Sequence, residues 1–117
     1  MDNRHLSILA HPTGRLIGER EPYGVDMERI MAAAHERGCY VELNADPDRL
    51  DLTDIHAQAA KSAGVKVVIS TDTHSTSGFA NMRFGIDQAR RGWLEADDVI
   101  NTRPLAELKK LLKRRQV

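Results

Sequence analysis

Asp72 and His74 are the two side chains in this sequence whose types and spacing most clearly suggest chemistry. Residues two apart in an extended segment point to the same side, so a carboxyl oxygen and an imidazole nitrogen can reach one cation. Divalent ions such as Zn²⁺ and Mn²⁺ accept this mixture of ligands. A plainer interpretation is also open, in which Asp72 caps the following turn and His74 is an ordinary polar loop residue.

Polar side chains also follow two other short apolar runs, and the three runs lie at residues 6–10, 39–43 and 65–69. Parallel strands bring their carboxyl ends to one edge of a sheet, where α/β proteins bind ligands. We therefore expect His11, after the first run, to be a third metal ligand. Arg15 offers a guanidinium fork for phosphate, although it equally fits a solvent-exposed position in a glycine-rich loop. Asn44, after the second run, is predicted to orient a ligand.

Segments with helical periodicity alternate with the apolar runs. Asp26 is a suitable N-cap for the first helix, and Gly38 stands where that helix should end. Alternating strands and helices predict βαβ units around a parallel sheet, hence the α/β fold class, and the unbroken apolar runs predict strands covered on both faces. The predicted inward stripes are Met27, Ile30, Met31 and Ala34; Leu52, Ile55, Ala59 and Ala63; Phe79, Met82, Ile86 and Ala89; and Leu105, Leu108, Leu111 and Leu112.

Length and composition limit the possible classes of protein. The 117 residues predict a single domain over 1–117, too short for a complete (β/α)8 barrel. The 17 basic and 17 acidic side chains balance, which gives no support to nucleic-acid binding by the whole surface. The single Cys39 excludes a disulfide scaffold and suits the cytoplasm. No apolar run is long enough to cross a membrane, so we expect no membrane partner.

Several stretches resemble the PHP (polymerase and histidinol phosphatase) domain, and most closely the one at the C-terminus of bacterial and archaeal family-X DNA polymerases. They follow one another in the family's order along nearly the whole chain. Residues 11–15 (HPTGR) and 101–104 (NTRP) are typical of the polymerase branch. The stretches that carry the resemblance are residues 8–15, 42–45, 49–52, 70–75, 81–83 and 91–94.

The resemblance implies a distorted seven-stranded (β/α) barrel, of which the parallel β/α units of this chain would form part. It also implies metal-dependent hydrolysis of phosphoesters, with DNA 3′ ends as the substrate in the complete repair polymerase and Mn²⁺ or Zn²⁺ as the cofactor. By motif, His11 matches the histidine of the family's H-P ligand, and Asp72 and His74 match its final D-x-H pair. Arg15 and Asn44 lie in matching stretches and are the predicted substrate-binding residues.

One motif of the family is absent, because no two of the five histidines are separated by a single residue and so no H-x-H is present. We therefore expect the C-terminal half of the domain, with an incomplete metal site and no assigned catalytic residue. A missing N-terminal half or a second copy of the chain would complete it. Two other functions stay open: a non-catalytic structural or oligomerising remnant, and a small-molecule phosphatase of the histidinol-phosphatase type.

Overall fold

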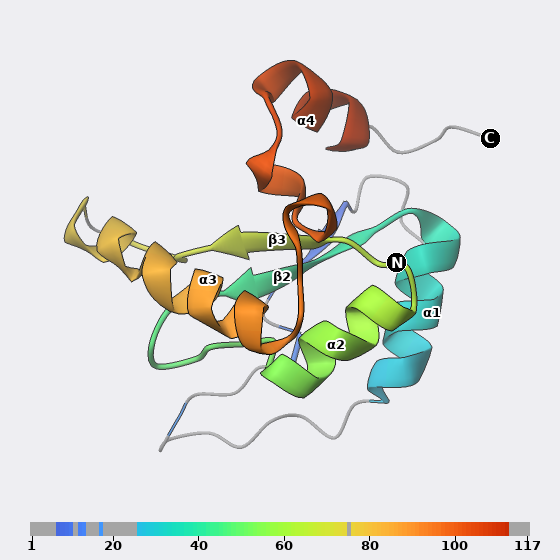
Figure 1. Ribbon diagram of the computed structural model, residues 1–117, viewed down its shortest axis with the longest axis horizontal. Helices are drawn as coiled ribbons and strands as arrows, with labels where there is room; N and C mark the ends of the chain where they lie inside the picture. The colour runs from blue at the N-terminus through green and yellow to red at the C-terminus, as the bar shows by residue number, and fades with distance from the viewer. Residues whose placement is uncertain (1–6, 11, 14–16, 18–25, 75, 113–117) are drawn as a thin grey trace.

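The computed structural model describes residues 7–10, 12–13, 17, 26–74 and 76–112, and its centre is a parallel sheet (Figure 1). The strand order is β1, β2, β3, with Val41 beside Val67 and Asn44 beside Ser70 in the two longer strands. This mixed α/β architecture confirms the predicted fold class. The strands are β1 (Ile8–Leu9), β2 (Tyr40–Asn44) and β3 (Val67–Ser70).

Helices join and flank the strands, and the first has the ends that the sequence predicts. The Asp26 side chain accepts a hydrogen bond from the backbone nitrogen of Arg29 at 3.2 Å. Gly38 ends the helix with φ 69°, a left-handed conformation that glycine adopts without a steric penalty. In the described part of the chain, no helix has the length and apolar character needed to cross a membrane. The helices are α1 (Met27–Arg37), α2 (Asp54–Ser62), α3 (Met82–Arg91) and α4 (Leu105–Leu112), with 3₁₀ turns η1 (Thr76–Asn81), η2 (Ala96–Asp98) and η3 (Ile100–Thr102).

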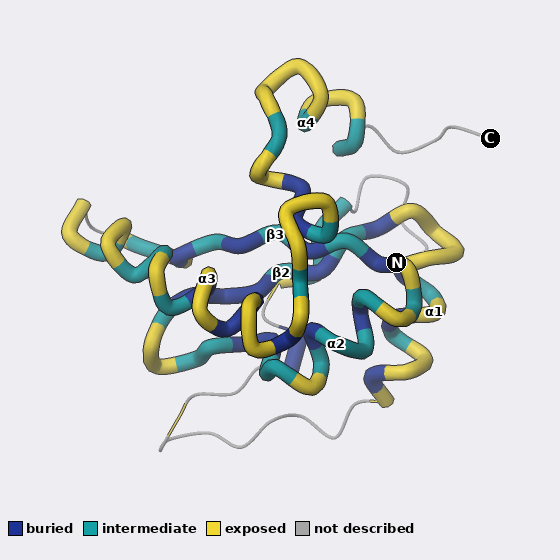
Figure 2. Tube along the Cα trace, viewed as in Figure 1, coloured by how far each residue is buried: buried dark blue, intermediate teal, exposed yellow. Residues whose placement is uncertain are grey.

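The hydrophobic core lies on one face of the sheet (Figure 2). Side chains alternate along a strand, and the register places the buried residues of β2 and β3 on the same side. The opposite face carries polar groups, among them Glu42 and Ser70, which are half-buried. The prediction of strands covered on both faces therefore fails for the described residues, which leave this second face only half-buried. The principal core residues are Met31 and Ala34 of α1, Val41 and Leu43 of β2, Ala60 of α2, Val67 and Ile69 of β3, and Ala89 of α3.

Helix α2 turns a different side to the core than its sequence pattern predicts. The Thr53 hydroxyl caps the helix, which therefore begins after Leu52 rather than at it. Ala57 and Ala60 are buried, whereas Ile55 is 70% exposed. The predicted stripe fails at Ile55, because Leu52 lies outside the helix and does not share its periodicity, although Leu52 itself is buried and Ala63 packs against the core.

Helix α3 approaches the sheet through a glycine. A β carbon at Gly85 would lie 2.6 Å from Cγ2 of Ile69 and 2.8 Å from Cβ of Ala45, so any side chain there would force the helix away. Phe79 and Ile86, both predicted to face inward, are exposed. The expected stripe fails because η1 holds Phe79 and breaks the helical periodicity before α3 begins.

Helix α4 is attached to the amino-terminal end of the sheet mainly by its last turn. The Ser7 hydroxyl donates to the carbonyl oxygen of Leu112 at 3.0 Å, and the Tyr40 hydroxyl donates to that of Leu111 at 2.9 Å. Partial burial raises the pKa of Tyr40, which keeps its hydroxyl a donor. Leu105 is exposed, contrary to its predicted inward position, while Leu108 is half-buried.

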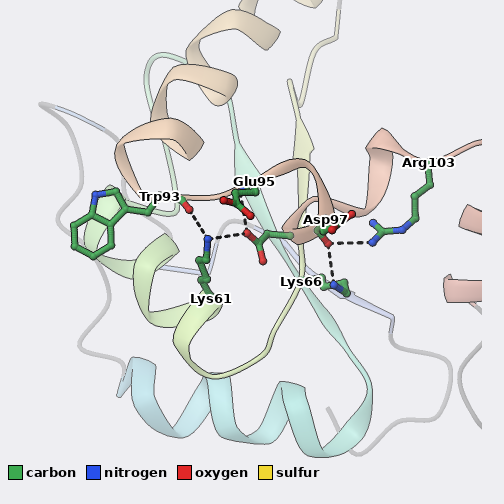
Figure 3. A network of polar contacts seen from close by, with 7 residues as sticks. Lys61, Lys66, Trp93, Glu95, Asp97 and Arg103 are labelled. Atoms are coloured by element: carbon green, nitrogen blue, oxygen red, sulfur yellow. Dashed lines mark hydrogen bonds and ion pairs between the residues drawn. The ribbon is translucent and has the colours of Figure 1, made fainter.

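The segment that follows α3 is fastened to the body of the domain by cations (Figure 3). Lys61 donates to the carbonyl oxygen of Trp93 at 2.7 Å and forms an ion pair with Asp98 at 3.3 Å. Partial burial of Asp98 opposes its charge, but a hydrogen bond from the backbone of Glu95 and the nearby Lys61 outweigh it, so the pKa of Asp98 lies below its ordinary value. Two further cations reach the carbonyl oxygen of Asp97: Lys66 at 2.8 Å and Arg103 at 3.0 Å.

The outer edge of β3 is covered by this same segment. Val99 forms an isolated parallel bridge with Val67. The side-chain amide of Asn101 donates to the carbonyl oxygen of Ile69 at 2.7 Å and accepts from its backbone nitrogen at 3.1 Å. Asn101 thus supplies the two hydrogen bonds that a neighbouring strand would otherwise provide at that position.

Replacing Asn101 by alanine is expected to lower the free energy of unfolding by about 1–3 kcal/mol, because it leaves a backbone donor and a backbone acceptor of β3 without partners. Urea unfolding followed by circular dichroism measures the change. Asn81→Ala is the matched control, since the Asn81 side chain makes no cap hydrogen bond, and it should cost less than about 0.5 kcal/mol. Equal losses in the two variants would show that the strand-like role of Asn101 contributes nothing.

Candidate functional site

The carboxyl ends of β2 and β3 lie side by side at one edge of the sheet, where both arrowheads point the same way in Figure 1. The register that pairs Asn44 with Ser70 brings the residues after each strand together. Asp72 follows β3 by two residues, so the parallel pairing delivers it to the same edge as Asn44. Of the predicted site residues, the structure brings these two into contact.

A hydrogen-bonded network of four side chains occupies this edge. The Ser70 hydroxyl donates to Oε2 of Glu42 at 2.7 Å. Nδ2 of Asn44 donates to Oε1 of Glu42 and to Oδ2 of Asp72, at 3.2 Å in each case. One amide therefore separates and orients two carboxyl groups that come from different strands. The network places acidic oxygen atoms on the polar side of the sheet.

The orientation of the Asn44 amide is set by all of its polar atoms. Its Oδ1 accepts a hydrogen bond from the backbone nitrogen of Asp46 at 3.0 Å, while Nδ2 donates twice. The residue is fully buried. An asparagine with both ends of its amide engaged cannot be flipped without losing bonds at each end. The Asn44 amide therefore orients the Asp72 carboxyl group through a hydrogen bond. The predicted contact of Asn44 with substrate stays a prediction.

The segment from Asp72 to His74 does not have the extended form that the metal-binding argument assumed. Asp72 has φ 51°, the left-handed region, which aspartate tolerates better than most residues. His74 is exposed, and the described residues show no hydrogen bond between it and Asp72. The assumption of an extended segment is therefore wrong at Asp72, whereas the prediction that Asp72 and His74 bind a metal stays a prediction.

Asp51 is a buried acidic residue, bridged to Asn44 of this edge, that the sequence pattern alone did not single out. Its carboxyl group is fully buried and accepts a hydrogen bond from the backbone nitrogen of Thr13, with distances of 3.2 Å to Oδ1 and 2.9 Å to Oδ2. Asp51 also forms an isolated bridge with Asn44. The available signal was its place in residues 49–52, one of the stretches that carry the resemblance.

His11 and Arg15 lie outside the described residues, so their predicted roles stay predictions. Within the described ranges, no group of three His, Cys, Asp or Glu side chains is placed to hold a metal ion. Glu42 and Asp72 are oxygen donors of the kind that divalent cations accept, but two carboxyl groups make an incomplete ligand set. A metal here would need further ligands from His11 or from beyond this part of the chain.

Comparison with known proteins gives a clear relationship. No family model matches the chain. The chain is 42% identical over 114 residues to the DNA polymerase/3′-5′ exonuclease PolX of Bacillus subtilis (strain 168), an alignment that covers 97% of the chain and 20% of that protein. The chain is therefore a homologue of a part of PolX. The resemblance inferred from the sequence motifs is confirmed.

Two probable phosphatases, from Thermoanaerobacter sp. (strain X514) and Thermoanaerobacter pseudethanolicus (strain ATCC 33223 / 39E), are more distant relatives. Each is 23% identical over 120 residues, covering 97% of the chain and 46% of the phosphatase. The chain thus spans about a fifth of PolX and less than half of either phosphatase. Relatives named as an exonuclease and as phosphatases share this stretch, which fits a phosphoesterase-type domain.

Asn44→Asp tests the role of the amide donor, because it replaces the NH₂ group between two carboxyl groups with a third carboxyl of the same shape. We expect a loss of about 1–3 kcal/mol in the free energy of unfolding at pH 7. Urea unfolding at pH 7 measures the loss, with Asn81→Asp as the control. A free energy of unfolding equal to that of the wild type would contradict the proposed donor role.

Proposed function

We propose that the chain is the C-terminal half of a PHP phosphoesterase domain of the kind associated with family-X DNA polymerases. Its parallel β/α units would then form part of the family's seven-stranded barrel, and residues 1–117 would be one folding unit of that barrel. The identity of 42% along 97% of the chain is the observation that carries the proposal. The polar network at the carboxyl ends of β2 and β3 supports it, since that edge is where parallel α/β folds hold their ligands.

The substrate class that we propose is the phosphoester at DNA 3′ ends, hydrolysed in the complete protein during DNA repair in the cytoplasm. DNA is then the partner of the whole protein, and PolX is named as a 3′-5′ exonuclease. A bound divalent cation, Mn²⁺ or Zn²⁺, would lower the pKa of a water molecule and polarise the phosphoryl oxygen. Arg15 is the proposed contact to a substrate phosphate, and a single, buried cysteine, Cys39, suits a reducing cytoplasm.

The proposed metal ligands are His11, Asp72 and His74. Asp72 is exposed, and its Oδ2 is occupied by the Asn44 amide. Its Oδ1 accepts no hydrogen bond from the described residues, so this oxygen is free to bind a cation. Asn44 would orient Asp72 from behind, in the way that outer residues orient metal ligands.

Three ligands do not make a multi-metal site, so we propose that the chain holds half of one. Glu42 and Ser70, on one face of the sheet, are only half-buried by the described residues. Among the described strands, β1 has two residues and pairs with β2 alone, so its outer edge is the proposed template for another strand. A missing N-terminal half of the domain or a second copy of the chain would pack there.

Titration calorimetry with Mn²⁺ and with Zn²⁺ tests the ligand set. We expect weak binding by the wild-type chain and an affinity at least about tenfold lower in Asp72→Ala, His74→Ala and His11→Ala, because each change removes a donor atom. Asp87→Ala is the control, since Asp87 is exposed on α3, away from the edge. Unchanged affinity in all three variants would remove these residues from the site.

Turnover by the isolated chain tests the half-site. With Mn²⁺ and a DNA oligonucleotide that ends in a 3′-phosphate, we expect little or no hydrolysis by the monomer, because the ligand set is incomplete. Light scattering on the same sample measures the mass. Robust turnover by a monomer would contradict the half-site, and preferential hydrolysis of a small phosphomonoester would favour the histidinol-phosphatase alternative. A folded dimer without turnover would favour the non-catalytic, oligomerising alternative.

A further inference from the structure

The buried carboxyl group of Asp51 joins two parts of the chain that are 38 residues apart. Both of its oxygen atoms accept from the backbone nitrogen of Thr13, and both residues are almost fully buried, at 0% and 1% exposed. Removing a carboxyl group from water is costly unless it is hydrogen-bonded. A hydrogen bond from a backbone N–H to a carboxyl group is among the stronger kinds, and here it fixes the chain just after β1.

The backbone of Asp51 is tied to the next strand. The backbone nitrogen of Asn44, the last residue of β2, donates to the carbonyl oxygen of Asp51, and the two residues form an isolated antiparallel bridge. The Asn44 side chain then donates to Asp72, beyond β3. A continuous set of hydrogen bonds therefore runs from Thr13 through Asp51 and Asn44 to Asp72, and so through the carboxyl ends of all three strands.

The turn that carries Asp51 is closed by backbone hydrogen bonds of its own. The backbone nitrogen atoms of Arg49 and Leu50 both donate to the carbonyl oxygen of Asp46 at 2.8 Å. A second hydrogen bond links this turn to the segment after β1: the backbone carbonyl oxygen of Asp48 accepts from the backbone nitrogen of Ile17 at 2.6 Å. The turn after β2 thus holds the chain after β1 at two points, residues 13 and 17.

We propose that Asp51 is a positioning residue, which fixes the chain after β1 at Thr13 relative to Asn44 and Asp72. Thr13 is two residues from His11 and two residues from Arg15 in the sequence. The tie would therefore set the distance between ligands contributed by the first and third strand ends. The role of Asp51 in positioning metal ligands rests on the proposed function. The link between Asp51 and Thr13 rests only on the observed hydrogen bonds.

Amide hydrogen exchange tests the tie directly and without metal. We expect the Thr13 amide to exchange at least about tenfold faster in Asp51→Ala, and by a smaller factor in Asp51→Asn, which keeps one acceptor oxygen. The amide of Val41 in the central strand should stay protected, which shows that the fold is intact. Asp87→Asn is the control and should leave Thr13 unchanged. Unchanged exchange at Thr13 in a folded Asp51 variant would overturn the proposal.

Mn²⁺ titration separates a positioning role from a merely structural one. We expect Asp51→Asn to weaken Mn²⁺ binding by about tenfold, the usual size of such an indirect effect on a metal site. Thr13→Pro removes the donor from the other side of the same hydrogen bond. If Asp51 acts through Thr13, the double variant should lose no more Mn²⁺ affinity than the more affected single variant.

Amide exchange at Thr13 and Mn²⁺ titration together distinguish a positioning role of Asp51 from a purely structural one. Fast exchange at Thr13 with unchanged Mn²⁺ affinity would overturn the positioning role and leave Asp51 a structural residue. Fully additive losses in the double variant would also overturn it. A wild-type chain that binds no Mn²⁺ would overturn the proposed metal site and the metal-positioning role with it, while the exchange rate of Thr13 would still decide whether Asp51 holds that strand end.

Discussion

The buried side chain of Asn44 is the interaction on which the edge of this sheet depends. A single amide group donates to Glu42 on its own strand and to Asp72 beyond the neighbouring strand, and accepts from the turn that follows. Two carboxyl groups held this close would otherwise repel each other, so a donor between them is required. The turn after β2 then adds the bond from Thr13 to Asp51, which brings in the third strand end.

The rest of the fold serves to keep that edge in position. The helices α1, α2 and α3 pack on the apolar side of the sheet, and α3 does so through Gly85, where no side chain separates it from β2 and β3. The far edge of β3 is occupied by Asn101, which pairs with Ile69 as a strand would. The described residues leave the polar side of the sheet only half-buried at Glu42 and Ser70.

Much of this arrangement followed from local patterns. Three strands, the alternation with helices and the Asp26 and Gly38 caps of α1 were predicted, because caps and strands have local signatures. Polar residues after the strands were expected to converge, and the contact between Asn44 and Asp72 is what the structure shows of this. The inward faces of α2 and α3 were not. Both helices pack through Ala57, Ala60 and Gly85, and small residues give a weak periodic signal, while Ile55 and Phe79 mimic a core stripe yet remain exposed.

The sequence by itself determined the class of fold, the relationship to PolX and the carboxyl, imidazole and guanidinium groups that follow the strands. Those properties are encoded in residue types and short spacings. Only the tertiary structure decided that the chain turns at Asp72, that Glu42 and Asp72 share one amide, and that Asp51 reaches back to Thr13. The contacts of Asn44 with Asp72 and of Asp51 with Thr13 join residues 28 and 38 positions apart, and which side chain meets which at that range is set by strand register and helix packing rather than by any local pattern.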